Sequence, residues 1–108
     1  MISNHGGRQL DGSRTAFDQL EEIVSAVGDR IDVLMDGGVQ RGTHVLKALS
    51  LGAKAVGIGR YYLYPLAAAG QSGVERALKN LHSELIRDMR LMGCKSVPEL
   101  SRNNIAFR

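Results

Sequence analysis

The hydrophobic positions of this chain follow two patterns, one typical of amphipathic helices and one typical of short buried strands. The first helix is predicted from apolar residues that recur three and four positions apart: Phe17, Leu20, Val24 and Val27. Thr15, with Asp18 three residues later, resembles a capping box at the start of this helix, and Gly28 provides its end. We therefore expect a helix between Thr15 and Gly28.

Two short apolar runs, residues 31–35 and 55–58, predict strands because they are too short for helices and are followed by turn residues. Such runs are typical of strands buried on both faces. Between them we expect a second helix that ends at Gly52 and turns these side chains inward: Val45, Ala48 and Leu49.

The last helix has the most regular apolar pattern in the chain. Ser72 and Glu75 form a second capping-box sequence, and Gly93 provides the end of the helix. Between them, apolar residues repeat at spacings of three and four: Val74, Leu78, Leu81, Leu85, Met89 and Met92. We expect one amphipathic helix that begins near Ser72.

Short apolar strands that alternate with amphipathic helices predict parallel βα units in an α/β fold. Residues 1–3 read as the end of a further strand, and the pairs Gly6-Gly7 and Gly37-Gly38 are separated by one unit length, 37 − 6 = 31 residues. About three such units are too few to close an eight-stranded barrel of ~250 residues. The pattern therefore indicates a segment of a larger parallel barrel, with no second domain within residues 1–108.

Composition narrows the classes of function. The chain is 44% hydrophobic and 23% charged, and its net charge of +3 comes from scattered Lys and Arg, without the basic stripe expected of nucleic-acid binding. No run approaches the ~20 apolar residues of a transmembrane segment. Cys94 is the only cysteine, and His44 and His82 have no partner at ligand spacing, so no metal site is expected. We expect a cytoplasmic protein and leave peripheral membrane association open.

The first sequence that suggests chemistry is SNHGGRQLD at residues 3–11. His5 and Arg8 follow the end of a strand, the position where α/β barrels carry their active sites. An imidazole can act as a general base near neutral pH, and a guanidinium can hold a carboxylate by two parallel hydrogen bonds. The pair suits a small acid that loses a proton. A structural loop with a solvated arginine is the alternative.

Two glycine-rich loops follow the other strands. Residues 36–42 (DGGVQRG) precede a helix, and residues 57–60 (GIGR) end the next strand. Glycine allows backbone amides to approach an anion, a helix N-terminus attracts negative charge, and barrels often bind phosphate at their last two loops. Phosphate binding is therefore the favoured reading, and tight turns alone are the alternative. We expect Tyr61, Tyr62 and Tyr64 to pack under the last helix.

The chain resembles the FMN-dependent 2-hydroxy-acid dehydrogenase and oxidase family, whose members act on lactate, glycolate, mandelate and related acids. The likeness extends from Ser3 to about Leu100. It is carried by SNHGGRQLD at 3–11, DGGVQRG at 36–42, KAL at 47–49, LGA at 51–53 and GR at 59–60. The first of these motifs is the most specific, because phosphate-binding barrels of other families share the glycine loops.

The resemblance implies a (β/α)₈ TIM barrel with FMN as cofactor, in which this chain would be the C-terminal part, strands six to eight with their helices. His5 corresponds to the catalytic base, and His5 and Arg8 bind the substrate. The implied cofactor-binding residues are Asp36, Gly37, Gly38, Val39, Gln40, Arg41, Gly59 and Arg60. One position departs from the family pattern: Gln40 stands where arginine is usual, so Arg41 or Arg60 would carry the charge that meets the phosphate.

The implied reaction is the oxidation of a small L-2-hydroxy acid to the 2-oxo acid in a full-length enzyme, for which a homo-oligomer is expected. The isolated chain is expected to be inactive. Two alternatives stay open. One is a segment of an IMP-dehydrogenase-like phosphate-binding barrel, which the spacing of His5 and Arg8 argues against. The other is a catalytically dead chain that acts only by association through exposed sheet edges.

Overall fold

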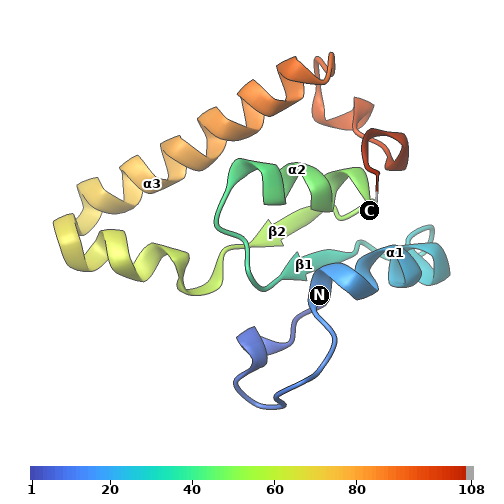
Figure 1. Ribbon diagram of the computed structural model, residues 1–108, viewed down its shortest axis with the longest axis horizontal. Coiled ribbons are helices and arrows are strands. Elements are labelled where there is room, and N and C mark those ends of the chain that lie inside the picture. Colours follow the sequence, from blue (N-terminus) through green and yellow to red (C-terminus); the bar gives the residue numbers. More distant parts are fainter. Residues whose placement is uncertain (107–108) are drawn as a thin grey trace.

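A small parallel sheet lies at the centre of the computed structural model, which describes residues 1–106 (Figure 1). Strand β1 (Leu34–Asp36) pairs in parallel with β2 (Ala55–Gly57), and Met35 lies opposite Val56. Ile2 forms an isolated parallel bridge to Met35 from the other side of β1. The predicted strand end at residues 1–3 is thus confirmed, and the three parallel segments follow one another in chain order.

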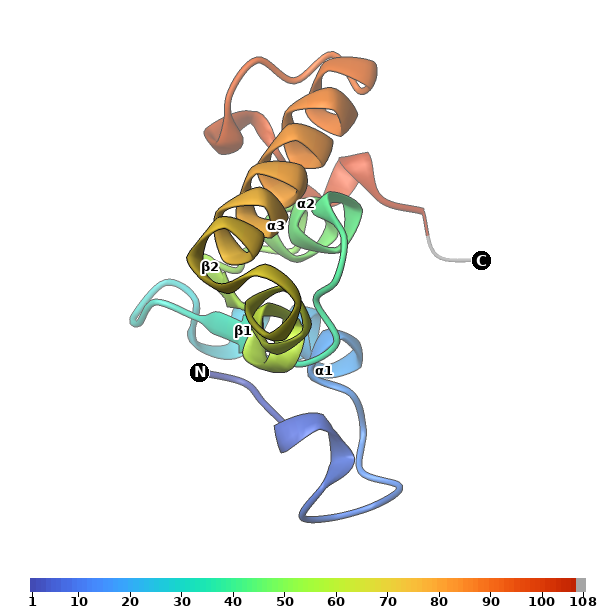
Figure 2. The same ribbon diagram turned by 90° about the vertical axis from the view of Figure 1, so that its left-hand side faces the viewer.

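The helices connect and cover these strands. Helix α1 (Ala16–Val27) joins the first segment to β1, α2 (Gly42–Ser50) joins β1 to β2, and α3 (Leu63–Leu91) follows β2. Short 3₁₀ turns lie at His5–Gly7, Gly59–Tyr62, Val97–Glu99 and Arg102–Asn104. Figure 2 shows the later part of α3 lying beside α2, against which it packs. The order of elements is the repeated βα pattern predicted from the sequence.

The core fills the space between the sheet and helices α1 and α2. Leu20 of α1 and Met35 of β1 are fully buried, and Ala48 of α2 packs in the same cluster. At the start of α1 the hydroxyl of Thr15 accepts a hydrogen bond from the amide of Asp18 (3.1 Å), which is one half of the predicted capping box. The inward face of the second helix differs from its prediction: Ala48 is buried as expected, but Leu46 is buried as well, whereas Val45 and Leu49 are only partly covered.

The expectation that the strands are buried on both faces is wrong for residues 1–106. Met35 is buried, but Leu34 and Asp36 on either side of it are half-buried, and Ala55 of β2 is exposed. The physical reason is that two-sided burial requires a layer on each face of a sheet. Within the part of the chain that the structure describes, α1 and α2 pack against one face only.

The last helix begins nine residues earlier than predicted (72 − 63 = 9), at Leu63 instead of Ser72. A sharp bend interrupts it at Ala69 and Gly70, where Gly70 has a φ of 56°. The predicted capping box is not formed, since the hydroxyl of Ser72 donates to the carbonyl of Ala69 (2.8 Å). Glycine adopts a positive φ without steric cost, so the helical sequence before it continues through the bend instead of ending there.

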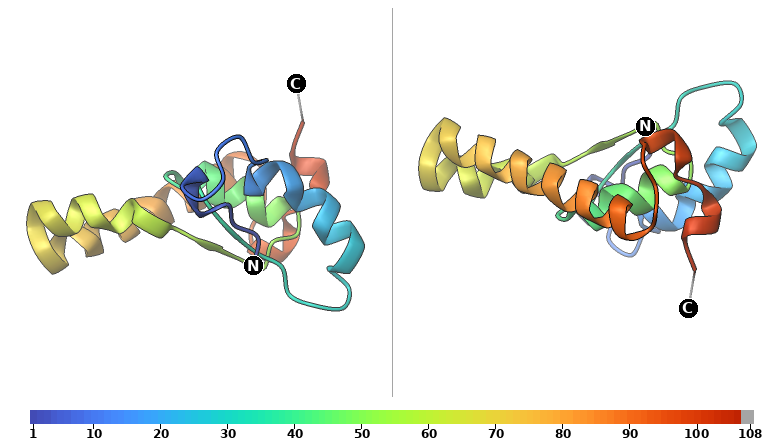
Figure 3. Two further views of the ribbon diagram at one scale, coloured as in Figure 1. Left: turned by 90° about the horizontal axis from the view of Figure 1, so that it is seen from below. Right: turned by 90° about the horizontal axis from the view of Figure 1, so that it is seen from above.

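The first part of α3 runs outward from the end of β2, and after the bend the helix turns back toward α2 (Figure 3). The predicted apolar stripe is therefore buried only where it reaches α2: Leu81 and Met89 are covered, but Leu78 is 47% exposed. Two further apolar residues before the bend, Leu63 and Leu66, are 43% and 44% exposed. No helix within residues 1–106 is long and apolar enough to cross a membrane.

Candidate functional site

All of the residues that the sequence analysis assigned to chemistry line one open cleft, of about 1460 Å³, at the carboxyl ends of the three strand segments. They are His5, Arg8, Asp36, Gly37, Gly38, Val39, Gln40, Arg41, Gly59 and Arg60. In parallel strands the carboxyl ends lie at one edge of the sheet, so residues that follow different strands meet there. Parallel pairing thus brings the two glycine loops and the His–Arg sequence together.

The His5 loop is held by the two side chains that precede it. The hydroxyl of Ser3 donates to a carboxylate oxygen of Asp36 (2.8 Å) and accepts a hydrogen bond from the amide of His5 (3.1 Å). The Asn4 side-chain oxygen accepts from the amide of Gly6 (3.0 Å). Among the non-glycine residues of 1–106, only His5 has a positive φ, 54°. The sequence analysis did not identify Ser3 as a site residue.

The first glycine loop presents backbone amides to the cleft. Gly37 and Gly38 have φ values of 119° and 75°, which an L side chain rarely adopts, and Val39 then anchors the loop in the core at 3% exposure. Within residues 1–106, the amides of Gly38 and Val39 donate to no acceptor. The amide of Gln40 donates to Nδ1 of His44 (3.2 Å). Two backbone donors therefore remain for an anion in the cleft.

Arg60 brings a positive charge across to the His5 loop. Its guanidinium lies so close to the backbone of Gly6 that a Cβ atom at that position would collide with it. No carboxylate or carbonyl within residues 1–106 bonds to this guanidinium. A cation that makes no internal ion pair in a cleft lined by backbone donors suits a phosphate group.

Arg41, unlike Arg60, forms an ion pair with a carboxylate of α3. Its guanidinium forms an ion pair with Glu84, with Nη2 and Oε1 2.9 Å apart, and the amide of Gly42 donates to the same carboxylate (2.8 Å). Next to them the hydroxyl of Thr43 donates to Asp88 (2.8 Å). The hydrogen bond from Arg41, reinforced by that from the Gly42 amide, holds the pKa of Glu84 below its usual value.

Glu84 occupies the N-terminus of α2 with its carboxylate. The N-terminus of α2 was expected to help attract a phosphate, but its first amide is already bonded to the Glu84 carboxylate. Of the two candidate arginines, Arg60 is the one whose charge is not neutralised within residues 1–106. No local sequence signal could have identified Glu84, because it lies 43 residues after Arg41.

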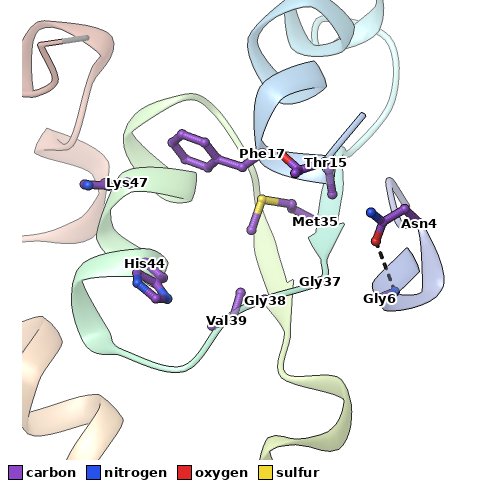
Figure 4. Close-up of a pocket in the computed structure, with 11 residues that line it drawn as sticks. Asn4, Gly6, Thr15, Phe17, Met35, Gly37, Gly38, Val39, His44 and Lys47 are labelled. Atoms are coloured by element: carbon purple, nitrogen blue, oxygen red, sulfur yellow. Dashed lines mark hydrogen bonds between the residues drawn. The ribbon is translucent and has the colours of Figure 1, made fainter. Parts of the chain in front are cut away.

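A second, smaller cavity of about 410 Å³ lies behind the first glycine loop, between α1 and α2 (Figure 4). Phe17, Met35 and Val39 give it an apolar floor, and His44 and Lys47 of α2 lie at its side. Gly6, Gly37, Gly38 and Val39 line both cavities, so the two cavities adjoin at the first glycine loop and the His5 loop.

The tyrosines do not pack under the last helix as expected. Tyr64 is 83% exposed and Tyr62 is 43% exposed, and both line the large cleft together with Tyr61. The part of α3 beyond the bend at Gly70 lines the same cleft through Arg76 and Asn80, so the tyrosines and this part of the helix border an open space instead of packing together.

The family model described as FMN-dependent dehydrogenase matches residues 1–107. The rat protein 2-hydroxyacid oxidase 2 is 51% identical over 107 residues, which are 99% of this chain and 30% of that protein. An L-lactate oxidase of Lacticaseibacillus rhamnosus is 49% identical over 104 residues, 96% of this chain and 28% of the oxidase.

Solved structures agree with the sequence relatives. Mandelate oxidase with benzoyl-formic acid superposes with a TM-score of 0.89 at 50% identity and covers 94% of this chain and 30% of the oxidase. The chain therefore spans less than a third of the length of the relatives it matches.

The first prediction concerns Glu84, which joins α3 to the start of α2. Its pKa is lowered in the folded state, so its ionised form stabilises the fold above the unfolded pKa of about 4.3, and this stabilisation is lost as the pH falls through the lower folded pKa. Glu84→Gln should therefore reduce the free energy of unfolding near neutral pH and have little effect in acid. Urea unfolding of the protein that contains this chain, over that pH range, measures the difference.

The matched control is Glu22→Gln. Glu22 also pairs with an arginine, Arg14 (3.1 Å), but their side chains are 73% and 60% exposed, so solvent screens the pair. This control should unfold like the parent protein at every pH. A loss of stability in Glu84→Gln that is equally large in acid would show that the charge of Glu84 is not the cause.

Proposed function

The chain belongs to the FMN-dependent dehydrogenase family, and on that premise we propose that it carries the base and the substrate clamp of an enzyme that oxidises a small L-2-hydroxy acid to the 2-oxo acid. The observation that carries this proposal is the single cleft that His5 and Arg8 line together with two glycine loops and Arg60. The names of the relatives, 2-hydroxyacid oxidase and L-lactate oxidase, support the class of substrate.

We propose further that the chain supplies strands six to eight, with their helices, of a (β/α)₈ barrel, as the C-terminal part of the family domain. Two findings support this position. Ile2, β1 and β2 form three parallel segments in chain order, each followed by a helix, and the chain covers about 30% of its relatives. In such a barrel the half-buried inner face of β1 would be covered by the other strands.

The residues of the cleft fit FMN. Its phosphate would lie between the amides of Gly38 and Val39 and the guanidinium of Arg60. None of these three groups donates a hydrogen bond to an acceptor within residues 1–106. Gly59 keeps its part of the rim open, since it has a φ of 45° and carries no side chain. Gln40 adds a neutral amide, and Arg41, although bonded to Glu84, also lines the cleft. Asp36, which the family resemblance assigns to the ribityl chain, lines the same cleft and would help to hold the cofactor.

In the proposed reaction, bound FMN, Arg8 and His5 have separate roles. When bound, FMN accepts the two electrons that leave the substrate. Arg8 holds the substrate carboxylate through two parallel hydrogen bonds, which fixes the hydroxyl-bearing carbon in the cleft. His5 takes a proton from the substrate as general base. Both side chains are exposed within residues 1–106, so an approaching acid can reach them.

The second prediction tests these roles in the full-length enzyme. His5→Ala should reduce the rate of flavin reduction by about 10²- to 10⁴-fold, the usual contribution of general acid–base catalysis, and leave FMN bound. Arg8→Lys should mainly weaken substrate binding, because an ammonium group cannot form the two-pronged grip. Stopped-flow bleaching of the flavin without oxygen measures both. Bleaching at the parent rate in His5→Ala would exclude His5 as the base.

The third prediction concerns the phosphate charge. Arg60→Gln should weaken FMN binding by about 10- to 100-fold, the value of one charge-assisted hydrogen bond, whereas Gln40→Ala should weaken it less. Riboflavin, which has no phosphate, is the control ligand and should bind both variants with little change. Dissociation constants from flavin fluorescence give the comparison, and equal losses of FMN in the two variants would contradict the role of Arg60.

The fourth prediction is that the 108-residue chain alone neither oxidises hydroxy acids nor forms a stable monomer. The strand segment at Ile2 and strand β2 are the two edges of a very small sheet, and unpaired edges associate with other chains. Apolar side chains before the bend of α3 are exposed as well. Analytical ultracentrifugation and a flavin-reduction assay with lactate test this, and a monodisperse, active monomer would contradict it.

A further inference from the structure

We propose that Ser3 is a positioning residue for the base, because its hydroxyl joins the backbone of His5 to the carboxylate of Asp36. The inference rests on the proposed role of His5 and goes beyond it. It assigns to a side chain outside the His–Arg pair the task of fixing the direction of the imidazole.

The register of the sheet places Ser3 beside Asp36. Ile2 bridges Met35, with the amide of Ile2 2.7 Å from the carbonyl of Leu34 and the amide of Asp36 2.8 Å from the carbonyl of Ile2. The residues that follow this pair, Ser3 and Asp36, are therefore neighbours at the carboxyl ends of adjacent strands. A shift of one residue would turn either side chain to the opposite face of the sheet and separate the two.

The hydroxyl of Ser3 serves as donor and acceptor at once. It donates to Oδ2 of Asp36 (2.8 Å) and accepts from the amide of His5 (3.1 Å). The Asp36 carboxylate lies against Gly57 of β2, where an added Cβ would come within 2.8 Å of Oδ1. The hydroxyl of Ser3 is thus bonded to a side chain that packs against the neighbouring strand. Alanine offers neither bond, whereas threonine offers both.

The backbone of His5 needs such support. Its φ of 54° lies in the left-handed region, which is unfavourable for a residue with a side chain and occurs at no other non-glycine residue of 1–106. The direction of the imidazole depends on this conformation. Without the hydrogen bond to Ser3, the backbone is expected to relax toward negative φ and turn the base away from the cleft.

The test uses the FMN-loaded full-length enzyme with Ser3→Ala, Ser3→Thr and Ser25→Ala. Ser3→Ala should reduce the rate of flavin reduction by about 10- to 100-fold, as expected for a displaced catalytic group, with little change in substrate KM or FMN affinity. Ser3→Thr should keep most of the rate. Ser25 is exposed on α1, so Ser25→Ala should behave as the parent enzyme.

If Ser3 had only a general structural role, the rate of flavin reduction in Ser3→Ala would fall only in proportion to the bound FMN that the variant loses. That outcome, or a rate equal to that of the parent enzyme, would overturn the proposal. If Ser3→Ala yields no holoenzyme, Ser3→Cys replaces it. A thiol has similar size and forms weaker hydrogen bonds, so a smaller loss of rate in the same direction is expected.

His5→Ala is measured in parallel. Activity in that variant would refute the role of His5 as base, whereas an inactive His5→Ala with an unaffected Ser3→Ala would refute only the positioning role of Ser3.

Discussion

The parallel pairing of three short segments is the constraint on which the rest of this structure depends. Ile2, Met35 and Val56 lie side by side in one register, and each segment runs directly into a loop that carries polar side chains or glycines. Because the strands are parallel, all three loops leave the sheet at the same edge. The helices between them bury Leu20 and Met35, which holds the register in place. The cleft is a consequence of this pairing and not of any single loop.

Long-range contacts from α3 then determine which groups of the cleft are available to a ligand. Glu84 bonds to the guanidinium of Arg41 and to the first amide of α2, so these donors satisfy one another within the protein. Arg60 and the amides of Gly38 and Val39 remain without internal partners in the part of the chain that the structure describes. The same helix thus stabilises the glycine loop from outside and leaves its inner side for an anion.

The cleft separates two tasks in space. The glycine loops and Arg60 provide fixed backbone donors and one charge, which suits a phosphate group that must be held firmly. His5 and Arg8 lie on a loop whose shape depends on Ser3 and Asn4. The side chain of Ser3 accepts a hydrogen bond from the amide of His5, and that of Asn4 accepts one from the amide of Gly6. Asp36 belongs to both regions, because it lines the cleft and also bonds to Ser3.

The sequence by itself determined the order of strands and helices, the cap at Thr15, and the part of the cleft lining formed by the His–Arg pair and the two glycine loops, because these follow from local spacing and from glycines that only certain turns require. Periodicity could not locate the start of α3, since Gly70 permits a bend where a stop was expected. It also could not show that Tyr64 is exposed or that Glu84 neutralises Arg41. Only the tertiary structure decided these points, because contacts between residues some forty positions apart depend on how the helices pack and leave no local periodic signal.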